Sequence, residues 1–141
     1  YIEIYNQRLY EENGIRQNFI QDDISTSKKN VLRGIHGDAT TCKLVSCLYG
    51  EFYLVVVNNN PESKQYKQWQ SFSLSDVNRK QVLIPPMYGN GHLVLSDKCI
   101  YHYKQTTEYN REGQFTIMWN DPEYNIKWPI QNPILSKRDG G

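Results

Sequence analysis

A long series of short strand-like segments, each ended by turn-forming residues, constrains the fold of this chain more than any other feature. Within the segments, β-branched and aromatic residues alternate with polar ones or form short apolar runs, which is typical of strands. Residues 49–50 (YG), 85–86 (PP) and 89–91 (GNG) are among the predicted turns. Many short strands with little helix predict an antiparallel sandwich or barrel. The predicted strands are residues 1–5, 19–25, 30–36, 42–48, 51–58, 69–74, 81–84, 92–96, 99–105 and 114–119.

Three regions depart from this strand pattern. Asn6 is a favourable N-cap and predicts a short helix through Glu12, which the following Asn-Gly pair would end. Residues 75–78 are predicted to form a helical turn. The tail, residues 121–139, is rich in turn-forming residues, and we expect it to lie over the mouth of the barrel.

Charge and cysteine content limit the classes of partner. Sixteen Lys and Arg against 15 Asp and Glu give a net charge of +1 with no basic block, so nucleic acid is not expected as the main partner. No apolar run is long enough to cross a bilayer and no signal peptide is visible, so no membrane partner is expected. Cys42, Cys47 and Cys99 are odd in number and lack metal-ligand spacing, which favours free thiols in a reducing compartment, the cytoplasm.

One predicted strand contains both Arg33 and His36, and Lys43 follows shortly after it. An imidazole transfers protons near neutral pH, and an ammonium group stabilises developing negative charge. A lone histidine in a strand is more often structural, so these residues alone leave both interpretations open. In a regular strand Arg33 and His36 would point to opposite faces. A pocket that uses both therefore requires an irregularity, which we expect at Gly34.

Several ordered segments resemble the dTDP-4-dehydrorhamnose 3,5-epimerase family. The resemblance extends over almost the whole chain, and the ordered set is more specific than its R-G-x-H motif alone. It implies an all-β double-stranded β-helix, or cupin jelly roll, with antiparallel sheets and one or two short helices. It also implies a single domain over residues 1–141 that lacks the N-terminal strands of the family. The segments are residues 19–23 (FIQDD), 32–36 (LRGIH), 101–109 (YHYKQTTEY), 119–122 (WNDP), 126–129 (IKWP) and 135–139 (LSKRD).

The same resemblance implies an isomerase that inverts C3, C5 or both of a nucleotide-linked 4-keto-6-deoxy sugar through an enolate, without a metal or other cofactor. This chemistry needs a base, a charge near the enolate oxygen and an acid on the opposite face of the sugar. His36 matches the base of the family, and Asp139 matches the carboxylate that pairs with it. Tyr103 matches the acid, and Lys43 matches the lysine near the ketone.

Other residues match the substrate pocket of the family. Arg33, Gln21 and Tyr109 occupy positions that line this pocket, whereas Asp23 stands where the family often has asparagine. The partner implied is a nucleotide-diphosphate 4-keto sugar, and the implied assembly is a homodimer.

The chain departs from the family around residue 90. Asn90 replaces a second pocket histidine, and His92, two positions later, is expected on the same side of the strand and in contact with substrate. These departures leave open which sugar and nucleotide bind and how many carbons are inverted. The alternatives are a sugar-nucleotide 3,4-ketoisomerase and a non-catalytic sugar-binding jelly roll. A metal-dependent cupin is least favoured because His36 has no second histidine near it in the sequence.

Overall fold

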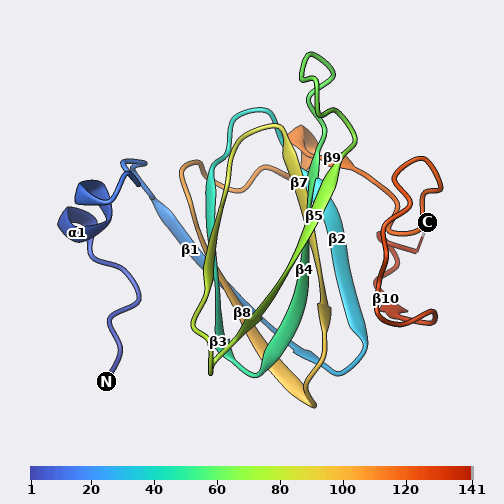
Figure 1. The fold of residues 1–141 in the computed structure, drawn as a ribbon, viewed down its shortest axis with the longest axis horizontal. Coiled ribbons are helices and arrows are strands. Elements are labelled where there is room, and N and C mark those ends of the chain that lie inside the picture. Colours follow the sequence, from blue (N-terminus) through green and yellow to red (C-terminus); the bar gives the residue numbers. More distant parts are fainter. Residues whose placement is uncertain (141) are drawn as a thin grey trace.

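Two β-sheets pack face to face in the computed structural model, which describes residues 1–140 (Figure 1). Successive strands from β1 to β8 alternate between the sheets, except that β4 and β5 follow one another in the same sheet. The four-stranded sheet has the order β1 (Gln21–Lys28), β8 (Lys98–Gln105), β3 (Lys43–Tyr49) and β6 (Gln81–Ile84). The six-stranded sheet has the order β10 (Ile134–Leu135), β2 (Val31–Gly37), β7 (Tyr88–Val94), β4 (Glu51–Asn58) and β5 (Trp69–Ser75), and β9 (Phe115–Thr116) pairs with β2.

Strand pairing confirms the predicted antiparallel sandwich with one exception. Every strand pair is antiparallel except β10 with β2, which is parallel. The tight turn at Gly50 between β3 and β4 is present, and Gly50 has a φ of +84°, which favours glycine. Residues 76–78 form the predicted turn between β5 and β6.

The main core lies between the two sheets. Its fully buried members include Phe52 and Leu54 of β4, Val45 of β3 and Val94 of β7. These residues come from both sheets, and their burial removes apolar surface from water, which is the main stabilising contribution in such a sandwich.

A second apolar cluster explains why β4 is buried on both faces. Val55 and Val57 are fully buried on the side opposite Leu54, where they belong to a cluster with Ile117 and the tail residue Trp128. The tail therefore packs along the outer face of the six-stranded sheet, beside β2 in Figure 1. The tail was predicted to lie over the mouth of the barrel, but most of it covers this outer face, which is apolar and needs a cover. Only its end reaches the cavity between the sheets, where Arg138 contributes to the lining.

The N-terminal region contains the predicted helix but not the predicted strand. Helix α1 (Gln7–Glu12) begins after Asn6, whose side chain accepts a hydrogen bond of 3.1 Å from the Leu9 N–H. Residues 1–5 form no strand; instead, the Ile4 carbonyl accepts hydrogen bonds from Tyr10 Oη and Gln81 Nε2. Within residues 1–140, no helix has the length and apolar content needed to span a membrane.

Two strand boundaries near the site differ from those predicted. Residues 89–91 were predicted to turn, but they lie inside β7. A Cβ on Gly89 would lie 2.8 Å from Ile35 Cγ2, so this glycine is required by close packing against β2 and not by a turn. The strand predicted for residues 114–119 is shorter, because only Phe115 and Thr116 pair with β2, after the 3-10 helix η1 (Arg111–Gly113).

Candidate active site

A cavity of about 260 Å³ opens between the two sheets and contains most of the residues predicted to act on a ligand. One wall comes from β1, β3 and β8 of the four-stranded sheet, and the other from β2 and β7 of the six-stranded sheet. Loop residues complete the rim. Its lining residues are Ser25, Arg33, Gly34, His36, Lys43, Asn90, His92, Tyr101, Tyr103, Tyr109, Gln114 and Arg138.

The predicted irregularity at Gly34 is confirmed and brings Arg33 and His36 to the same cavity. Arg33 pairs with His92 and His36 pairs with Asn90, so β2 has one more residue than β7 over this interval. Gly34 has a φ of +119°, and a Cβ there would lie 2.5 Å from Gly91 Cα. Glycine is therefore required at this position, and the bulge reverses the alternation that would have separated the two side chains.

The imidazole of His36 is held by the carboxylate of Asp139, as predicted for these two residues. Nε2 of His36 lies 2.7 Å from Oδ1 of Asp139, whose other oxygen accepts a hydrogen bond from the Gly34 N–H. Asp139 is 4% exposed. Burial opposes its ionisation, but the hydrogen bonds from His36, Gly34 and Ser136 outweigh burial and keep its pKa below the usual value.

The orientation of the ring identifies the basic nitrogen. A carboxylate only accepts hydrogen bonds, so Nε2 of the neutral ring bears the proton and Nδ1 bears the lone pair. Nδ1 lies 3.2 Å from the hydroxyl of Thr116, which pairs with His36 across β2 and β9. Sequence reasoning did not select Thr116, and its cross-strand position depends on a pairing that no motif indicates.

Tyr103 and Lys43 enter the cavity from the opposite sheet. Lys43 Nζ lies 5.0 Å from the centroid of the Tyr103 ring. Burial lowers the pKa of Lys43, while the nearby carboxylates of Asp38 and Asp23 oppose this shift. Burial also raises the pKa of Tyr103, and the neighbouring Asp23 carboxylate raises it further. The phenol is therefore neutral and protonated near pH 7.

Asp23 lies beside Tyr103 on the neighbouring strand β1, and neither Asp23 nor Gln21 lines the cavity. Tyr103 Oη donates a hydrogen bond of 3.0 Å to Asp23 Oδ2, and Gln21 Nε2 donates one of 2.8 Å to the same oxygen. Gln21 Oε1 accepts a hydrogen bond of 3.0 Å from the backbone N–H of Tyr109, whose side chain lies at the cavity rim. Gln21 and Asp23 therefore contact residues of the cavity wall, and the contact with a ligand predicted for them stays a prediction.

Asn90 and His92 both face the cavity, as the alternation of β7 requires. Asn90 Oδ1 accepts a hydrogen bond of 3.1 Å from Tyr101 Oη. His92 stacks on Tyr101 with ring centroids 4.0 Å apart, and its buried Nε2 has no hydrogen-bond partner among the described residues. Burial, together with the nearby Arg33 cation, lowers the pKa of His92 to about 3, so its ring is neutral at pH 7.

Ser25, Gln114 and Arg138 also line the cavity and were not selected from the sequence. Arg138 Nη2 donates a hydrogen bond of 2.8 Å to Gln114 Oε1, which joins the tail to the loop after η1. Its position next to Asp139 in the LSKRD segment was a usable signal for Arg138. In contrast, His102 alternates with Tyr101 and Tyr103 along β8, so it faces away from the cavity, and it lies 2.8 Å from Asp22.

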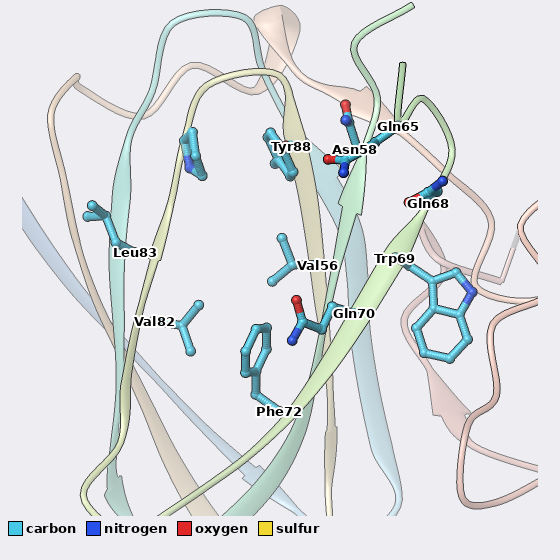
Figure 2. Close-up of a pocket in the computed structure, with 11 residues that line it drawn as sticks. Val56, Asn58, Gln65, Gln68, Trp69, Gln70, Phe72, Val82, Leu83 and Tyr88 are labelled. Carbon is cyan, nitrogen blue, oxygen red and sulfur yellow. The ribbon is translucent and has the colours of Figure 1, made fainter. Parts of the chain in front are cut away.

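A second cavity, of about 360 Å³, lies at the other edge of the sandwich between β5 and β6 (Figure 2). Val56, Phe72 and Val82 point toward one another between the sheets in this view. Amide side chains, including Asn58 and Gln70, complete its lining, and Tyr88 is its one titratable residue among those described. This cavity lacks the acid–base pair that the first one has, so it is not the candidate for proton transfer.

Two facing sheets with titratable side chains on both walls of one cavity define a jelly-roll protein with a candidate acid–base site. The chain belongs to the dTDP-4-dehydrorhamnose 3,5-epimerase family, whose sequence model matches residues 1–141. Members of this family are isomerases. The family, the cupin jelly-roll fold and the enzyme class predicted from the sequence are therefore confirmed.

Individual relatives are similar over nearly the whole chain. The dTDP-4-dehydrorhamnose 3,5-epimerase of Salmonella typhimurium is 40% identical over 144 residues, which cover 99% of this chain and 79% of the relative. A dTDP-4-dehydrorhamnose 3-epimerase of Streptomyces niveus is 34% identical over 125 residues, which cover 84% of this chain and 59% of the relative. The solved structure of a 3,5-epimerase from Legionella pneumophila in complex with dTDP-4-keto-L-rhamnose superposes with a TM-score of 0.92 at 39% identity. The match covers 98% of this chain and 76% of that structure's chain.

Proposed function

We propose that this protein epimerises a nucleotide-linked 4-keto-6-deoxy sugar, of the dTDP-4-dehydrorhamnose type, at C3, C5 or both. The observation that carries the proposal is that His36 and Tyr103 face one cavity from opposite sheets. Epimerisation next to a ketone removes a proton on one face of the ring and returns one on the other face. A base and an acid on opposite walls provide this geometry. The names of the relatives, which are 3,5-epimerases and a 3-epimerase, support the same reaction.

In the proposed mechanism His36 is the general base. Nδ1 takes the proton from the carbon next to the ketone, and the Asp139 carboxylate stabilises the imidazolium that forms. The C–H electrons become the C=C bond of an enolate, whose oxygen bears the negative charge. The Lys43 ammonium is placed to stabilise that charge, since its partial burial strengthens electrostatic attraction. Tyr103 then returns a proton from the opposite wall, which inverts the centre.

Cations at the cavity support an anionic diphosphate as part of the ligand. Arg33 and Arg138 line the cavity together with Lys43. The net charge of the chain is only +1, so this local cluster attracts an anion without general affinity for nucleic acid. Tyr109, Asn90 and His92 provide aromatic and hydrogen-bonding surface for the sugar or base, and Gln21 and Asp23 hold Tyr109 and Tyr103 through hydrogen bonds.

The proposed groups provide a base, an acid and a stabilising charge, so we propose that no metal or other cofactor is required. We further propose a single jelly-roll domain that works as a homodimer, by analogy with the family. We also propose that the protein works in the cytoplasm. Cys42, Cys47 and Cys99 are buried and unpaired, which fits a reducing compartment.

Deuterium exchange from solvent tests the reaction directly. In D2O, wild-type protein should introduce deuterium at C3 or C5 of a dTDP-linked 4-keto-6-deoxyhexose and form inverted product. His36→Ala should lose both activities by about 10³-fold, because the base is removed. Tyr103→Phe should keep exchange and lose inversion, because the phenol returns the proton only after the enolate has formed.

His102→Gln is the matched control, because this histidine lies outside the cavity, and it should behave as wild type. Binding of the sugar nucleotide without any exchange would refute the epimerase and indicate a non-catalytic sugar-binding jelly roll. A product whose ketone has moved to C3 would indicate a 3,4-ketoisomerase instead. NMR of the product distinguishes these outcomes.

A further inference from the structure

The one proton of the Tyr103 hydroxyl is directed at Asp23, which does not line the cavity. Tyr103 and Asp23 are direct partners in the antiparallel pairing of β8 with β1, so both side chains leave the sheet on the same face. The phenol donates its hydrogen bond to Asp23 Oδ2 at 3.0 Å. A phenol has a single O–H, so while this bond is made, Tyr103 has no proton to offer to a carbon in the cavity.

The carboxylate that accepts this proton is itself held in place. Gln21 lies two residues before Asp23 on β1 and donates to the same Oδ2 at 2.8 Å. The backbone of Tyr109 in turn donates to Gln21 at 3.0 Å. This chain of contacts joins the rim of the cavity to the hydroxyl of Tyr103. Asp23 therefore cannot move away from the phenol without breaking at least one of the two contacts of Gln21.

Charge makes the restraint stronger when Tyr103 acts as an acid. As the Tyr103 O–H bond breaks, a C–H bond forms at the enolate carbon, the carbonyl re-forms, and a phenolate remains. That phenolate would lie within hydrogen-bond distance of the Asp23 carboxylate, and two like charges so close are unfavourable. Lys43, at 5.0 Å from the ring centroid, compensates only in part because its own charged form is disfavoured by burial. Solvent then returns the proton to the phenolate.

We propose that Asp23 is a positioning residue that restrains proton return from the Tyr103 side, so that this protein exchanges the protons next to the ketone more often than it inverts the carbon. The inference rests on the proposed function. Asp23 thereby influences which residue returns a proton to the enolate. Return of a proton from His36 preserves the configuration, and return from Tyr103 inverts it.

The ratio of inverted product to deuterium in recovered substrate of unchanged configuration measures this balance. The His36 side chain is 17% exposed, so its imidazolium can exchange with D2O before the proton returns. Asp23→Asn removes the charge and keeps the shape. We expect it to raise the ratio about tenfold, because a like charge beside an acid shifts its pKa by one or more units. KM should change less than about twofold, since Asp23 does not line the cavity.

Two further variants make the test specific. Asp23→Ser removes the charge with a smaller side chain, so it decides the question if the asparagine variant does not fold. Asp22→Asn is the matched control: it makes the same change of charge one residue away, on the outer face, where Asp22 contacts His102 and Lys104. It should leave the ratio unchanged.

A ratio within about twofold of wild type in both Asp23 variants would overturn the inference, and so would an equal rise in Asp22→Asn. These results are distinct from failure of the proposed function. If wild-type protein shows neither exchange nor inversion, the epimerase itself is refuted. A wild type that exchanges and inverts while the Asp23 variants leave the ratio unchanged refutes only the role of Asp23.

Discussion

At the scale of the residue, the site depends on side chains whose chemistry is set by their nearest contacts. In the proposed mechanism, His36 is oriented as the base by Asp139, which holds Nε2 at 2.7 Å. Burial disfavours the charged form of both Tyr103 and His92 by raising the pKa of the phenol and lowering that of the imidazole, and both rings are neutral near pH 7. His92 therefore acts in the cavity as a neutral hydrogen-bonding and stacking group, and it does not replace a charged histidine.

Replacing Asp139 by asparagine tests the orientation of the base. The amide can donate to Nε2, which would place the ring proton on Nδ1, the nitrogen that should accept the substrate proton. We expect Asp139→Asn to lower kcat about 100-fold with KM within about threefold, as measured by steady-state kinetics. Ser136→Ala removes a hydrogen bond to Asp139 but keeps the carboxylate, and should lower kcat by less than about threefold. Similar losses in the two variants would argue against an orienting carboxylate.

At the scale of the element, strand β2 is the part of the chain that assembles one wall of the site. Its bulge at Gly34 brings Arg33 and His36 into one cavity, and the Gly34 N–H also holds Asp139. The neighbouring strand β7 contributes two glycines, Gly89 and Gly91, that permit its close approach to β2. This irregularity was predictable from the sequence because two functional side chains three positions apart cannot share a face of a regular strand.

Gly34→Ala tests the requirement for this bulge. The added Cβ would lie 2.5 Å from Gly91 Cα and 2.6 Å from the Asn90 carbonyl oxygen, at a positive φ. We expect a loss of about 3 kcal/mol in the free energy of unfolding in urea, from backbone strain and overpacking together. Gly14→Ala is a matched control, since its φ is +96° but no atom lies within 4 Å of the new Cβ. It should cost only about 1 kcal/mol. Equal losses would show that packing against β7 does not matter.

At the scale of the whole molecule, the tail connects the outer face of one sheet to the cavity between both sheets. Trp128 packs against Tyr53 with ring centroids 5.9 Å apart, and Trp128 Nε1 donates to the Trp119 carbonyl. The same tail then brings Arg138 and Asp139 to the cavity. Folding stability and the completeness of the site are therefore linked through one segment.

Buried His92 should make the stability of the whole protein depend on pH. Its pKa is about 3 in the folded protein and about 6.5 when the chain is unfolded, so the unfolded state binds the extra proton first as pH falls. This contribution to stability is complete above pH 6.5 and is lost as pH falls toward 3. It should give a slope of about 1.4 kcal/mol per pH unit between pH 6 and 4.

Urea unfolding of His92→Phe across this pH range checks the slope. The phenyl ring can stack on Tyr101 but binds no proton, so the variant should lose that share of the pH dependence. Tyr101→Phe changes the same stack, where the rings lie 4.0 Å apart, and keeps the imidazole, so it should retain the wild-type slope. A wild type and a His92→Phe variant with parallel profiles would contradict a neutral buried imidazole.

The sequence by itself determined most of the strands, the helix after Asn6 and the need for a bulge at Gly34. These features follow from local periodicity, capping and steric rules that act within a few residues. It did not determine that residues 89–91 extend a strand, because whether glycines form a turn or allow close packing depends on the neighbouring strand. The family resemblance selected His36, Lys43, Tyr103 and Asp139 as site residues, which composition alone did not do.

Only the tertiary structure decided which of these groups meet and in what orientation. Asp139 reaches His36 from 103 residues away, and Asp23 reaches Tyr103 across 80 residues through the register of β1 with β8. The tail lies on the outer face of a sheet because β4 is apolar and buried on both sides, and the sequence of a strand does not specify which segment covers it. Strand register and packing are set by contacts between distant segments, so no local pattern specifies them.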